Sequence, residues 1–356
     1  MKELLLLSNM YPDKAHPTKG VFVRNTEQQL ISAGFDVQRI VVGNTHKANR
    51  LAKLCLYLSF IARATARLLK NDDPVYLHYV AHTSVPLILS HFFHRQTVIA
   101  HAHGGDVIPA PHDNSLTRRL KIMLSRRTLK IARSVIVPSQ FLADRLVDDY
   151  DIIPDKIIII PSGGVDSHIF HYRQRKSKGS SEYLRIGYVG RLDKGKGVDT
   201  LIRAIQSSNL PIQCTITGAG SAHNSLQALT CALDLTEKIS FSGPCEHNQL
   251  GDIYRQLDFL IFPSELEESL GLVGLEAMAC GTPIIGSLKG GMAEYISNDI
   301  NGFAFAPGNA ASLASCIAKA YNMSSEEYAA MSSNAHETSK AYDARYCAER
   351  LVQVFS

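Results

Sequence analysis

The stretch that decides the fold runs from residue 259 to residue 283 and reads FLIFPSELEESLGLVGLEAMACGTP. Its first four residues, Phe259 to Phe262, form an apolar run of strand length, and a loop that contains glycines follows. The loop leads into a helix-length segment that Gly281 and Pro283 bring to an end. A strand, a loop and a helix in this order are typical of a parallel sheet covered by helices.

The same alternation of strand-length and helix-length segments extends over the whole chain. The expected strands lie at residues 4–7, 37–42, 75–78, 98–101, 134–137 and 157–160, and again at 184–189, 214–217, 239–241, 259–262 and 283–285. The polar segment HYRQRKSKGSSE, residues 171–182, separates the two series and is the predicted linker. The pattern predicts an α/β protein with two doubly wound domains, residues 1–170 and 183–335. The segment 336–356 is a candidate helix that packs back on the first domain.

Length and composition agree with two globular domains, since 356 residues are enough for two cores and the chain is 45% apolar and 20% charged. Its seven cysteines are scattered and form no Cys-x-x-Cys, which argues against a disulfide framework and a thiolate zinc site. We read this cysteine usage as that of a reducing cytoplasm. No stretch reaches the roughly 18 to 20 apolar residues of a membrane-spanning helix. We therefore expect a soluble or peripheral protein of the cytoplasm that does not act on nucleic acid.

Ligands of doubly wound sheets bind beyond the carboxyl ends of the strands, so the loop after Phe262 is a candidate site. Free amides of Leu270, Gly271 and Leu272 at the start of the helix would hold a phosphate. Glu276 inside the helix could accept from the diol of a ribose, and Glu268 before it could reach a sugar hydroxyl. A solvated acidic turn before a surface helix is the alternative interpretation.

Glu268 and Glu276 match the E-x7-E motif of the GT-B glycosyltransferases called family 4, and the surrounding PS…ESLGL…EAMACGTP is similar to that family almost throughout. The resemblance implies the GT-B fold, in which two Rossmann-like domains face each other across a cleft. It also implies a retaining, metal-independent transfer of a sugar from a nucleotide diphosphate donor. No cofactor is implied beyond the nucleotide sugar, which is the substrate.

Further segments resemble the family in the same order along the chain. In GRLDKGKG, residues 190–197, the family's diphosphate-binding cations correspond to Arg191 and Lys196, with Lys194 as an alternative cation and a solvated basic turn as the other interpretation. Gly218 begins a strand-end G-x-G, Cys245 ends the segment whose backbone reads the base, and residues 290–294 look like the G-G-x-x-E loop. As a dinucleotide fingerprint the G-x-G fails, because His223 stands where the third glycine belongs.

In the first domain, His103 to Asp106 is similar to the family's H-G-x-D, whose histidine approaches the donor sugar. His101 and His103 could instead be hydrogen-bonded loop histidines or part of a metal site, but His112 and Asp113 complete a metal site poorly. We therefore predict no metal. Gly20 lies in a loop that the family places beside the donor phosphates. Residues 160–166, IPSGGVD, have Ser162 where the family commonly has Asn.

The resemblance favours a transfer on one face of the sugar through an oxocarbenium-like state. Arg191, Lys196 and the helix amides would stabilise the leaving diphosphate, and the catalytic-site residues His103 and Glu268 would position the sugar. A sugar-nucleotide epimerase of the same fold, a non-catalytic nucleotide-sugar-binding protein and a dinucleotide oxidoreductase are the competing readings, and the last lacks its fingerprint.

Charge is uneven along the chain, with 21 Lys and Arg against 14 Asp and Glu in residues 1–170 and 16 against 19 in the rest. Two acid-free segments carry the basic excess, and each puts basic residues at helical spacing beside apolar ones. They are Arg63, Arg67 and Lys70 in the first, and Arg119, Arg126, Lys130 and Arg133 in the second. Solvated helix faces would explain both. The alternative, which we favour, is that the first domain docks on an anionic membrane surface and meets a glycan or lipid-linked acceptor in polysaccharide assembly.

Overall fold

The computed structural model describes residues 2–13, 20–42, 49–70, 72–108, 114–173 and 183–356. It divides into two compact units. The N-terminal unit comprises Met1–Gly164 together with Arg345–Ser356, and the C-terminal unit comprises Val165–Ala344. The chain thus passes from one unit to the other twice, and most of the predicted linker, residues 174–182, lies outside the described residues.

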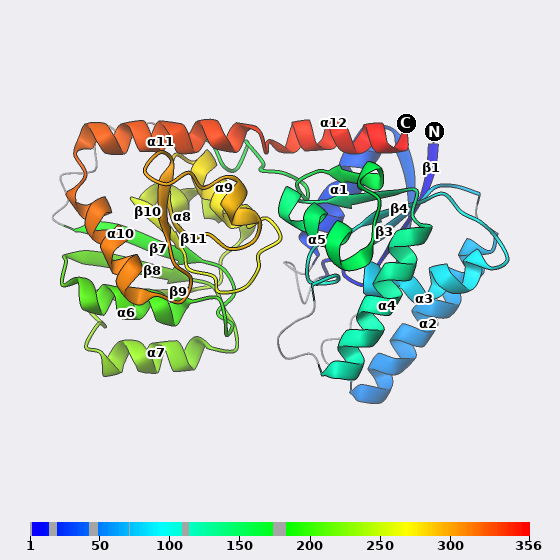
Figure 1. Ribbon diagram of the computed structural model, residues 1–356, viewed down its shortest axis with the longest axis horizontal. Helices are drawn as coiled ribbons and strands as arrows, with labels where there is room; N and C mark the ends of the chain where they lie inside the picture. Colours follow the sequence, from blue (N-terminus) through cyan, green and yellow to red (C-terminus); the bar gives the residue numbers. More distant parts are fainter. Residues whose placement is uncertain (1, 14–19, 43–48, 71, 109–113, 174–182) are drawn as a thin grey trace. The chain divides into compact units, whose positions relative to one another are not determined.

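The N-terminal unit contains a six-stranded sheet in the order β2-β1-β3-β4-β5-β6, and every neighbouring pair is parallel. Its strands are β1 Lys2–Ser8, β2 Phe35–Val41, β3 Val75–His78, β4 Val98–His101, β5 Ser134–Val137 and β6 Ile157–Ile159. Its helices are α1 Val21–Ser32, α2 Arg50–Leu68, α3 Val80–His91, α4 Ser115–Ile131, α5 Gln140–Tyr150, the short η1 Pro154–Lys156, and the C-terminal α12 Ala344–Phe355. Figure 1 shows helices over both faces of this sheet.

Strand β1 shows why the sheet is covered on both faces. Leu5 and Leu7 belong to a core with side chains of α2, α3, α4 and α5, whereas Leu4 and Leu6 belong to a core with α1 and α12. Successive side chains of a strand point to opposite faces, so a continuous run of leucines needs an apolar layer on each side. Phe355 of α12 completes the second layer, with its ring centroid 5.0 Å from that of Tyr76.

The C-terminal unit has a second all-parallel sheet in the order β12-β11-β10-β7-β8-β9. Its strands are β7 Leu184–Val189, β8 Ile212–Thr217, β9 Ile239–Gly243, β10 Phe259–Phe262, β11 Ile284–Ser287 and β12 Gly302–Phe305. Its helices are α6 Val198–Ser208, α7 His223–Ala232, η2 His247–Gln249, α8 Leu250–Gln256, α9 Leu272–Ala279, η3 Gly291–Glu294, α10 Ala310–Asn322 and α11 Ser325–Lys340. The sheet again has a core on each face.

The two sheets confirm the predicted class, two doubly wound α/β units with parallel strands. Counted from its own first strand, the C-terminal unit has the 3-2-1-4-5-6 order of a dinucleotide-binding fold, whose direction reverses between β7 and β10. In the N-terminal unit the order reverses at β1 and β3. Ligands of such sheets bind beyond the strand ends at these reversals, so the loops after β7, β10, β1 and β3 are where a site is expected.

Candidate functional site

The loops after β7 and β10 pack directly on each other in the C-terminal unit. The amide of Glu265 donates to the carbonyl of Gly195 over 2.8 Å. Gly197 has a φ of +71°, and a Cβ there would stand 1.9 Å from the carbonyl oxygen of Pro263. Only glycine allows both the left-handed backbone and this close approach, so the glycines of the 190–197 loop serve the contact between the loops.

The contact between the loops brings Lys196 to Glu268. Nζ of Lys196 lies 2.6 Å from Oε1 of Glu268, and the hydroxyl of Ser264 donates to the same oxygen over 2.6 Å. The side chains of Lys196 and Glu268 are 15% and 17% exposed, so the pair is mostly withdrawn from water. Two of the predicted site residues, one predicted to bind the donor diphosphate and one predicted to position the sugar, are therefore in direct contact.

A third loop fixes the backbone of Glu268. Glu268 and Gly290 form an isolated parallel bridge, and the amide of Gly291 donates to the carbonyl of Glu268 over 2.8 Å. Gly290 has a φ of +69°, and a Cβ there would stand 2.3 Å from that carbonyl oxygen. The paired glycines at 290 and 291 thus support the loop that carries Glu268.

Glu276 lies buried within α9, with 8% of its surface exposed. The hydroxyl of Tyr254 donates to its Oε2 over 2.9 Å. Burial raises the pKa of the Glu276 carboxyl to about 7, and the Tyr254 hydrogen bond opposes that rise. A carboxyl group with this pKa changes its charge near neutral pH. A hydrogen-bond donor that approaches it would therefore favour its ionised form.

The start of α9 has the geometry expected for an anion site. Gly271 caps the helix in the left-handed conformation, at φ +82°, and its carbonyl accepts a 2.9 Å hydrogen bond from the hydroxyl of Tyr295. Leu270 is buried before the cap and Leu272 opens the helix. The first amides of a helix have no partner within it and point outward along its axis. At the other end, the amides of Gly281 and Thr282 donate to the carbonyls of Met278 and Ala277, which closes α9 where the glycine was predicted to end it.

The other predicted donor residues lie at the same edge of this sheet. Arg191 follows β7, and its side chain is 74% exposed with Nη1 3.1 Å from Oδ2 of Asp193. Gly218 follows β8, where a Cβ would stand 1.8 Å from the carbonyl oxygen of Gly190. Cys245 follows β9, half-buried. Arg191, Lys196, Gly218, Cys245 and the loop carrying Glu268 to Leu272 all come directly after parallel strands, so the C-terminal unit gathers them at one edge.

The predicted site residues of the N-terminal unit, Gly20 and His103, also lie at a carboxyl edge. Gly20 caps α1 at φ +74°, and a Cβ there would stand 3.0 Å from backbone atoms of Met10 and Tyr11. Phe22, two residues later, packs its ring on that of His103 with centroids 4.4 Å apart. Asp106 holds the His103 loop, because its buried carboxylate accepts from the amides of His103 and Val80 over 2.9 Å and 2.8 Å.

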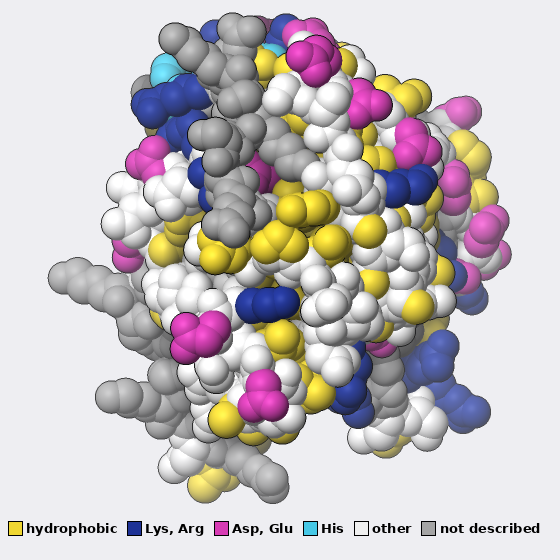
Figure 2. Space-filling model, turned by 90° about the vertical axis from the view of Figure 1, so that its left-hand side faces the viewer, with side chains coloured by type: hydrophobic (Ala, Val, Ile, Leu, Met, Phe, Trp, Pro, Cys, Tyr) yellow, Lys and Arg dark blue, Asp and Glu magenta, His cyan; other side chains and the backbone are white. Residues whose placement is uncertain are grey.

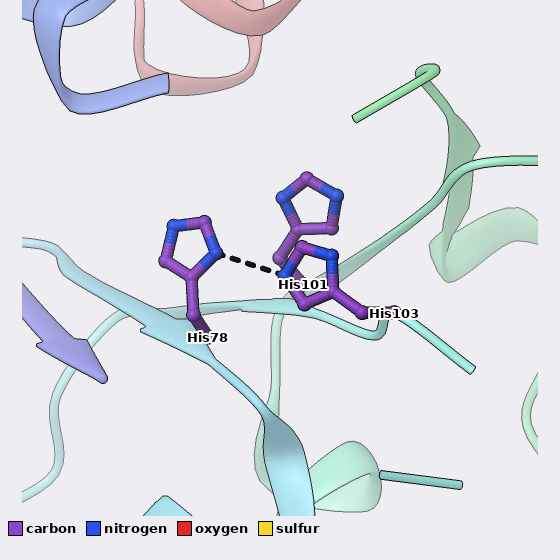
Figure 3. Close-up of side chains that lie close together, drawn as sticks. All are labelled: His78, His101 and His103. Carbon is purple, nitrogen blue, oxygen red and sulfur yellow. Dashed lines mark hydrogen bonds between the residues drawn. The ribbon is translucent and has the colours of Figure 1, made fainter. Parts of the chain in front are cut away.

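Three histidines cluster at this edge (Figure 3). Nδ1 of His78, at the end of β3, lies 2.9 Å from Nε2 of His103, and the rings of His101 and His103 stack with centroids 4.2 Å apart. Burial lowers the pKa of all three imidazoles, that of His101 to about 3 and those of His78 and His103 well below the usual value. The three side chains are therefore neutral at pH 7.

The cluster also raises the metal alternative again, since one ring nitrogen of each histidine lies within 4.8 Å of the others. The ring planes are inclined to one another by only 8°, 24° and 32°. Nδ1 of His78 and Nε2 of His103 share a hydrogen bond at 2.9 Å, so one of these two nitrogens carries a proton and offers no lone pair to an ion. The arrangement fits stacked, hydrogen-bonded rings better than a ligand set. Independence from metal stays a prediction for this site.

Sequence reasoning missed the residues that hold the predicted ones. His78, Ser264, Tyr254 and Tyr295 contact His103, Glu268, Glu276 and Gly271, respectively. His78 is the last residue of β3 and Ser264 follows β10 closely, so the strand-end rule could have singled them out. Tyr254 lies on α8 and Tyr295 just beyond η3, and neither belongs to a motif.

Two family profiles match the chain and between them cover most of it. Residues 20–167 match the profile described as Glycosyltransferase Family 4. Residues 172–338 match the profile described as Glycosyl transferases group 1. Among curated proteins, the chain is similar to the D-inositol 3-phosphate glycosyltransferase of Actinosynnema mirum, with 26% identity over 317 residues, which are 79% of this chain and 74% of that protein.

Solved structures share the fold over the whole chain. Sucrose-phosphate synthase (tll1590) of Thermosynechococcus elongatus superposes with a TM-score of 0.84 at 19% identity, over 100% of this chain and 98% of that one. Anabaena Alr3699/HepE in complex with UDP and glucose gives a TM-score of 0.77 at 19% identity, over 99% of both chains. The chain has the GT-B fold and belongs to glycosyltransferase family 4, a retaining family that uses nucleotide-sugar donors and in general needs no metal ion.

Proposed function

We propose that this enzyme transfers a sugar, with retention, from a nucleotide diphosphate sugar held by the C-terminal unit to a glycan or lipid-linked acceptor at an anionic membrane surface. The part of the proposal that concerns the donor rests on one observation. Lys196 contacts Glu268 in the loop that leads into α9, at the point where the strand order reverses. A cation, a carboxylate and outward-pointing amides at that place suit a diphosphate joined to a sugar.

In this proposal each residue has a separate task. Arg191, Lys196 and the amides of residues 270–272 stabilise the diphosphate as it leaves, and Glu276 accepts from the ribose diol. Glu268 and His103 position the sugar. The acceptor proton passes to an oxygen of the departing phosphate, so no additional base is required. The relative HepE was solved with UDP and glucose, which makes uridine nucleotides the first donors to try.

The part of the proposal that concerns the acceptor and the membrane rests on the helices of the N-terminal unit. Neither α2 nor α4 contains an acidic residue, and α3 packs against both. Large apolar side chains are exposed along this layer: Leu51, Leu54 and Leu58 on α2, Phe92 and Phe93 after α3, and Leu116, Leu120 and Met123 on α4. Leu116, Leu120 and Met123 follow one another at helical spacing, so they form a stripe on α4. Exposed apolar residues on acid-free basic helices match an anionic bilayer, with about 1 kcal/mol for each Lys or Arg near it.

The structure changes which basic residues the docking can use. Arg126 donates to the carbonyl of Asp149 and lies near the carboxylate of Asp151, which Lys130 also approaches. Arg133 lies beyond the end of α4, in the link to β5. These three were expected to form one stripe with Arg119, but Asp151 offsets part of the charge of Arg126 and Lys130. Arg118, Arg119 and Arg127 are exposed on α4 itself, and Arg127 covers the ring of Phe92. We therefore assign the docking to these three arginines and the apolar stripe.

On the face turned to the viewer in Figure 2, basic and acidic side chains are dispersed among apolar ones. Among the described residues, no helix combines the length and apolarity needed to cross a bilayer.

Transfer can be tested by incubating the enzyme with a UDP-sugar and vesicles that carry extracted lipid-linked glycans, in EDTA. We expect a glycosylated lipid whose new anomeric centre has the configuration of the donor. Conversion of the donor in the absence of any acceptor would favour the epimerase instead. Activity that disappears in EDTA and returns with magnesium or manganese would contradict the metal-independent reaction.

Docking can be tested separately by sedimentation with vesicles. Binding should require anionic lipid, weaken with salt, and fall at least tenfold in the triple variant Arg118→Glu, Arg119→Glu, Arg127→Glu. Arg203→Glu on α6, an exposed arginine of the other unit, is the control for a change of charge. Equal binding to neutral vesicles, or none to either kind, would show that α2 and α4 are only solvated faces.

A further inference from the structure

Five side chains of the N-terminal unit form one continuous hydrogen-bonded chain. The hydroxyl of Tyr76 lies 2.7 Å from Nδ1 of His101, and Nε2 of His101 lies 3.3 Å from Oγ of Ser162. Oγ of Ser162 also lies 3.3 Å from Nδ1 of His103, whose Nε2 is 2.9 Å from Nδ1 of His78. Figure 3 shows the last of these bonds between the rings of His78 and His103.

The direction of such a chain is set at one end. A neutral imidazole has one nitrogen that donates and one that accepts. The role of one nitrogen in its hydrogen bond therefore fixes the role of the other nitrogen of the same ring. The phenol of Tyr76 is fully buried and keeps its proton, because burial raises its pKa. When this phenol donates to Nδ1 of His101, 2.7 Å away, the proton of His101 stays on Nε2. Ser162 then accepts from His101 and donates to Nδ1 of His103, and His103 carries its proton on Nε2.

We propose that Tyr76, His101, Ser162 and His78 are positioning residues that hold His103 as the Nε2–H tautomer, with its donor hydrogen held ready for a hydroxyl of the donor sugar. His78 accepts that hydrogen while no sugar is bound. The proposal rests on the assignment of His103 to the donor sugar, because the tautomer matters for transfer only if that ring meets the substrate.

At the other end of the chain, His78 holds the remaining proton. With Nδ1 accepting from His103, His78 keeps its own proton on Nε2, and that atom is buried with no partner among the described residues. Both nitrogens of His103 are engaged within the unit, so a sugar hydroxyl would replace His78 at Nε2 rather than find a free nitrogen. Since Asp106 fixes the backbone at His103, the exchange can take place without a movement of the loop.

The tautomers can be read directly from imidazole nitrogen chemical shifts in the intact protein labelled with ¹⁵N-histidine. We expect Nε2–H forms for His78, His101 and His103 at pH 7. In Ser162→Ala, which cuts the chain between the rings, His103 should become a mixture of both tautomers, whereas Ser162→Thr should keep the single form. Ser90→Ala removes a fully buried hydroxyl of the same unit, on α3, and should leave all three spectra unchanged. An Nδ1–H form at His103 in the unaltered protein, or an Nε2–H form that persists in Ser162→Ala, would overturn the proposal.

Turnover gives the functional readout. Ser162→Ala should lower kcat about tenfold, the upper range for one neutral hydrogen bond, with a smaller change in the donor KM, and Ser162→Thr should recover most of it. Equal kcat in Ser162→Ala and the unaltered enzyme would refute the link to transfer. If the unaltered enzyme transferred no sugar at all, the proposed function would fail while the nitrogen spectra still decided the hydrogen-bond chain.

Discussion

Nζ of Lys196 and Oε1 of Glu268 lie 2.6 Å apart, although 71 residues separate them in the sequence. Each comes from the loop after one of two paired strands, β7 and β10, and the glycine at 197 lets those loops touch. Both side chains are mostly buried, so a substitution that removes one charge leaves the other buried without its main partner. The ion pair therefore couples the predicted diphosphate contact to the predicted sugar contact.

Lys196→Met should reduce kcat/KM for transfer by a factor of about 100 or more, because a cation that stabilises the leaving diphosphate is lost. It should also lower the free energy of unfolding by about 1–3 kcal/mol, since the partly buried Glu268 is left without its cation. Steady-state kinetics and urea unfolding measure the two effects. Lys194→Met is the matched control, because Lys194 lies two residues away on the same loop and is exposed. An equal loss in both variants would contradict the assignment of Lys196.

Donor affinity should depend on the charge of Glu276. Ribose hydroxyls donate hydrogen bonds, so they bind the ionised carboxylate, and protonation below a pKa of about 7 removes that acceptor. The Kd of a UDP-sugar should therefore be nearly constant above pH 8 and rise as the pH falls below 7, levelling off near the Kd of Glu276→Gln. Isothermal titration calorimetry across this range measures it. Glu276→Gln should show weak, nearly pH-independent binding, and a wild-type pH dependence in that variant would assign the effect to another group.

The same carboxyl group should make the free protein less stable at alkaline pH. A folded-state pKa of about 7, above the usual 4.5, means that the folded protein binds the proton more tightly than the unfolded chain. This contribution to stability is complete below pH 4.5 and is lost as the pH rises to about 7, by an amount on the order of 3 kcal/mol. Glu276→Gln should thus be more stable than the unaltered protein at pH 8, and the difference should shrink towards pH 4.5. A stability difference between Glu276→Gln and the unaltered protein that is the same at pH 8 and pH 4.5 would contradict this prediction.

Two glycines with the same left-handed backbone allow the loop contact to be tested. Gly197 and Gly243 have φ values of +71° and +74°, but a Cβ at Gly197 would stand 1.9 Å from the carbonyl oxygen of Pro263, whereas nothing lies within 4 Å of one at Gly243. Gly243→Ala should cost about 1–2 kcal/mol of unfolding free energy for the backbone conformation alone. Gly197→Ala should cost clearly more and also abolish donor binding, because the loops after β7 and β10 would be forced apart. Similar costs in urea unfolding would mean that the loops separate freely.

Most of the fold could be predicted because strands buried on both faces are continuous apolar runs. The bounds of β3, β4, β5, β7 and β10 agree with the expected ones. Strand β8 begins two residues earlier than expected, because the exposed Gln213 interrupts the apolar run. Strand β12, Gly302–Phe305, was missed: it is four residues long, lies at the sheet edge, and opens with a glycine whose Cβ would meet the carbonyl oxygen of Ile284.

The candidate site could be predicted only as a set of loops. Motif order placed Arg191, Lys196, Glu268 and Glu276 after the correct strands, but contacts between separate loops leave no trace in local spacing. The pairing of Lys196 with Glu268 depends on which strands are neighbours in the sheet. For the same reason His78, a single histidine at the end of β3, could not be joined to His101 and His103 before the register of β3 and β4 was known.

Thermal unfolding in EDTA with a panel of nucleotide sugars tests the central claim, donor binding by the C-terminal unit, most directly. A ligand that binds only the folded protein stabilises it, by about 2.7 kcal/mol at one hundred times its Kd. We predict that at least one nucleotide diphosphate sugar raises the Tm of the unaltered protein in EDTA and that the rise is lost in Lys196→Met and retained in Lys194→Met. A Tm that no nucleotide sugar changes, or that rises equally in Lys196→Met, would contradict the account.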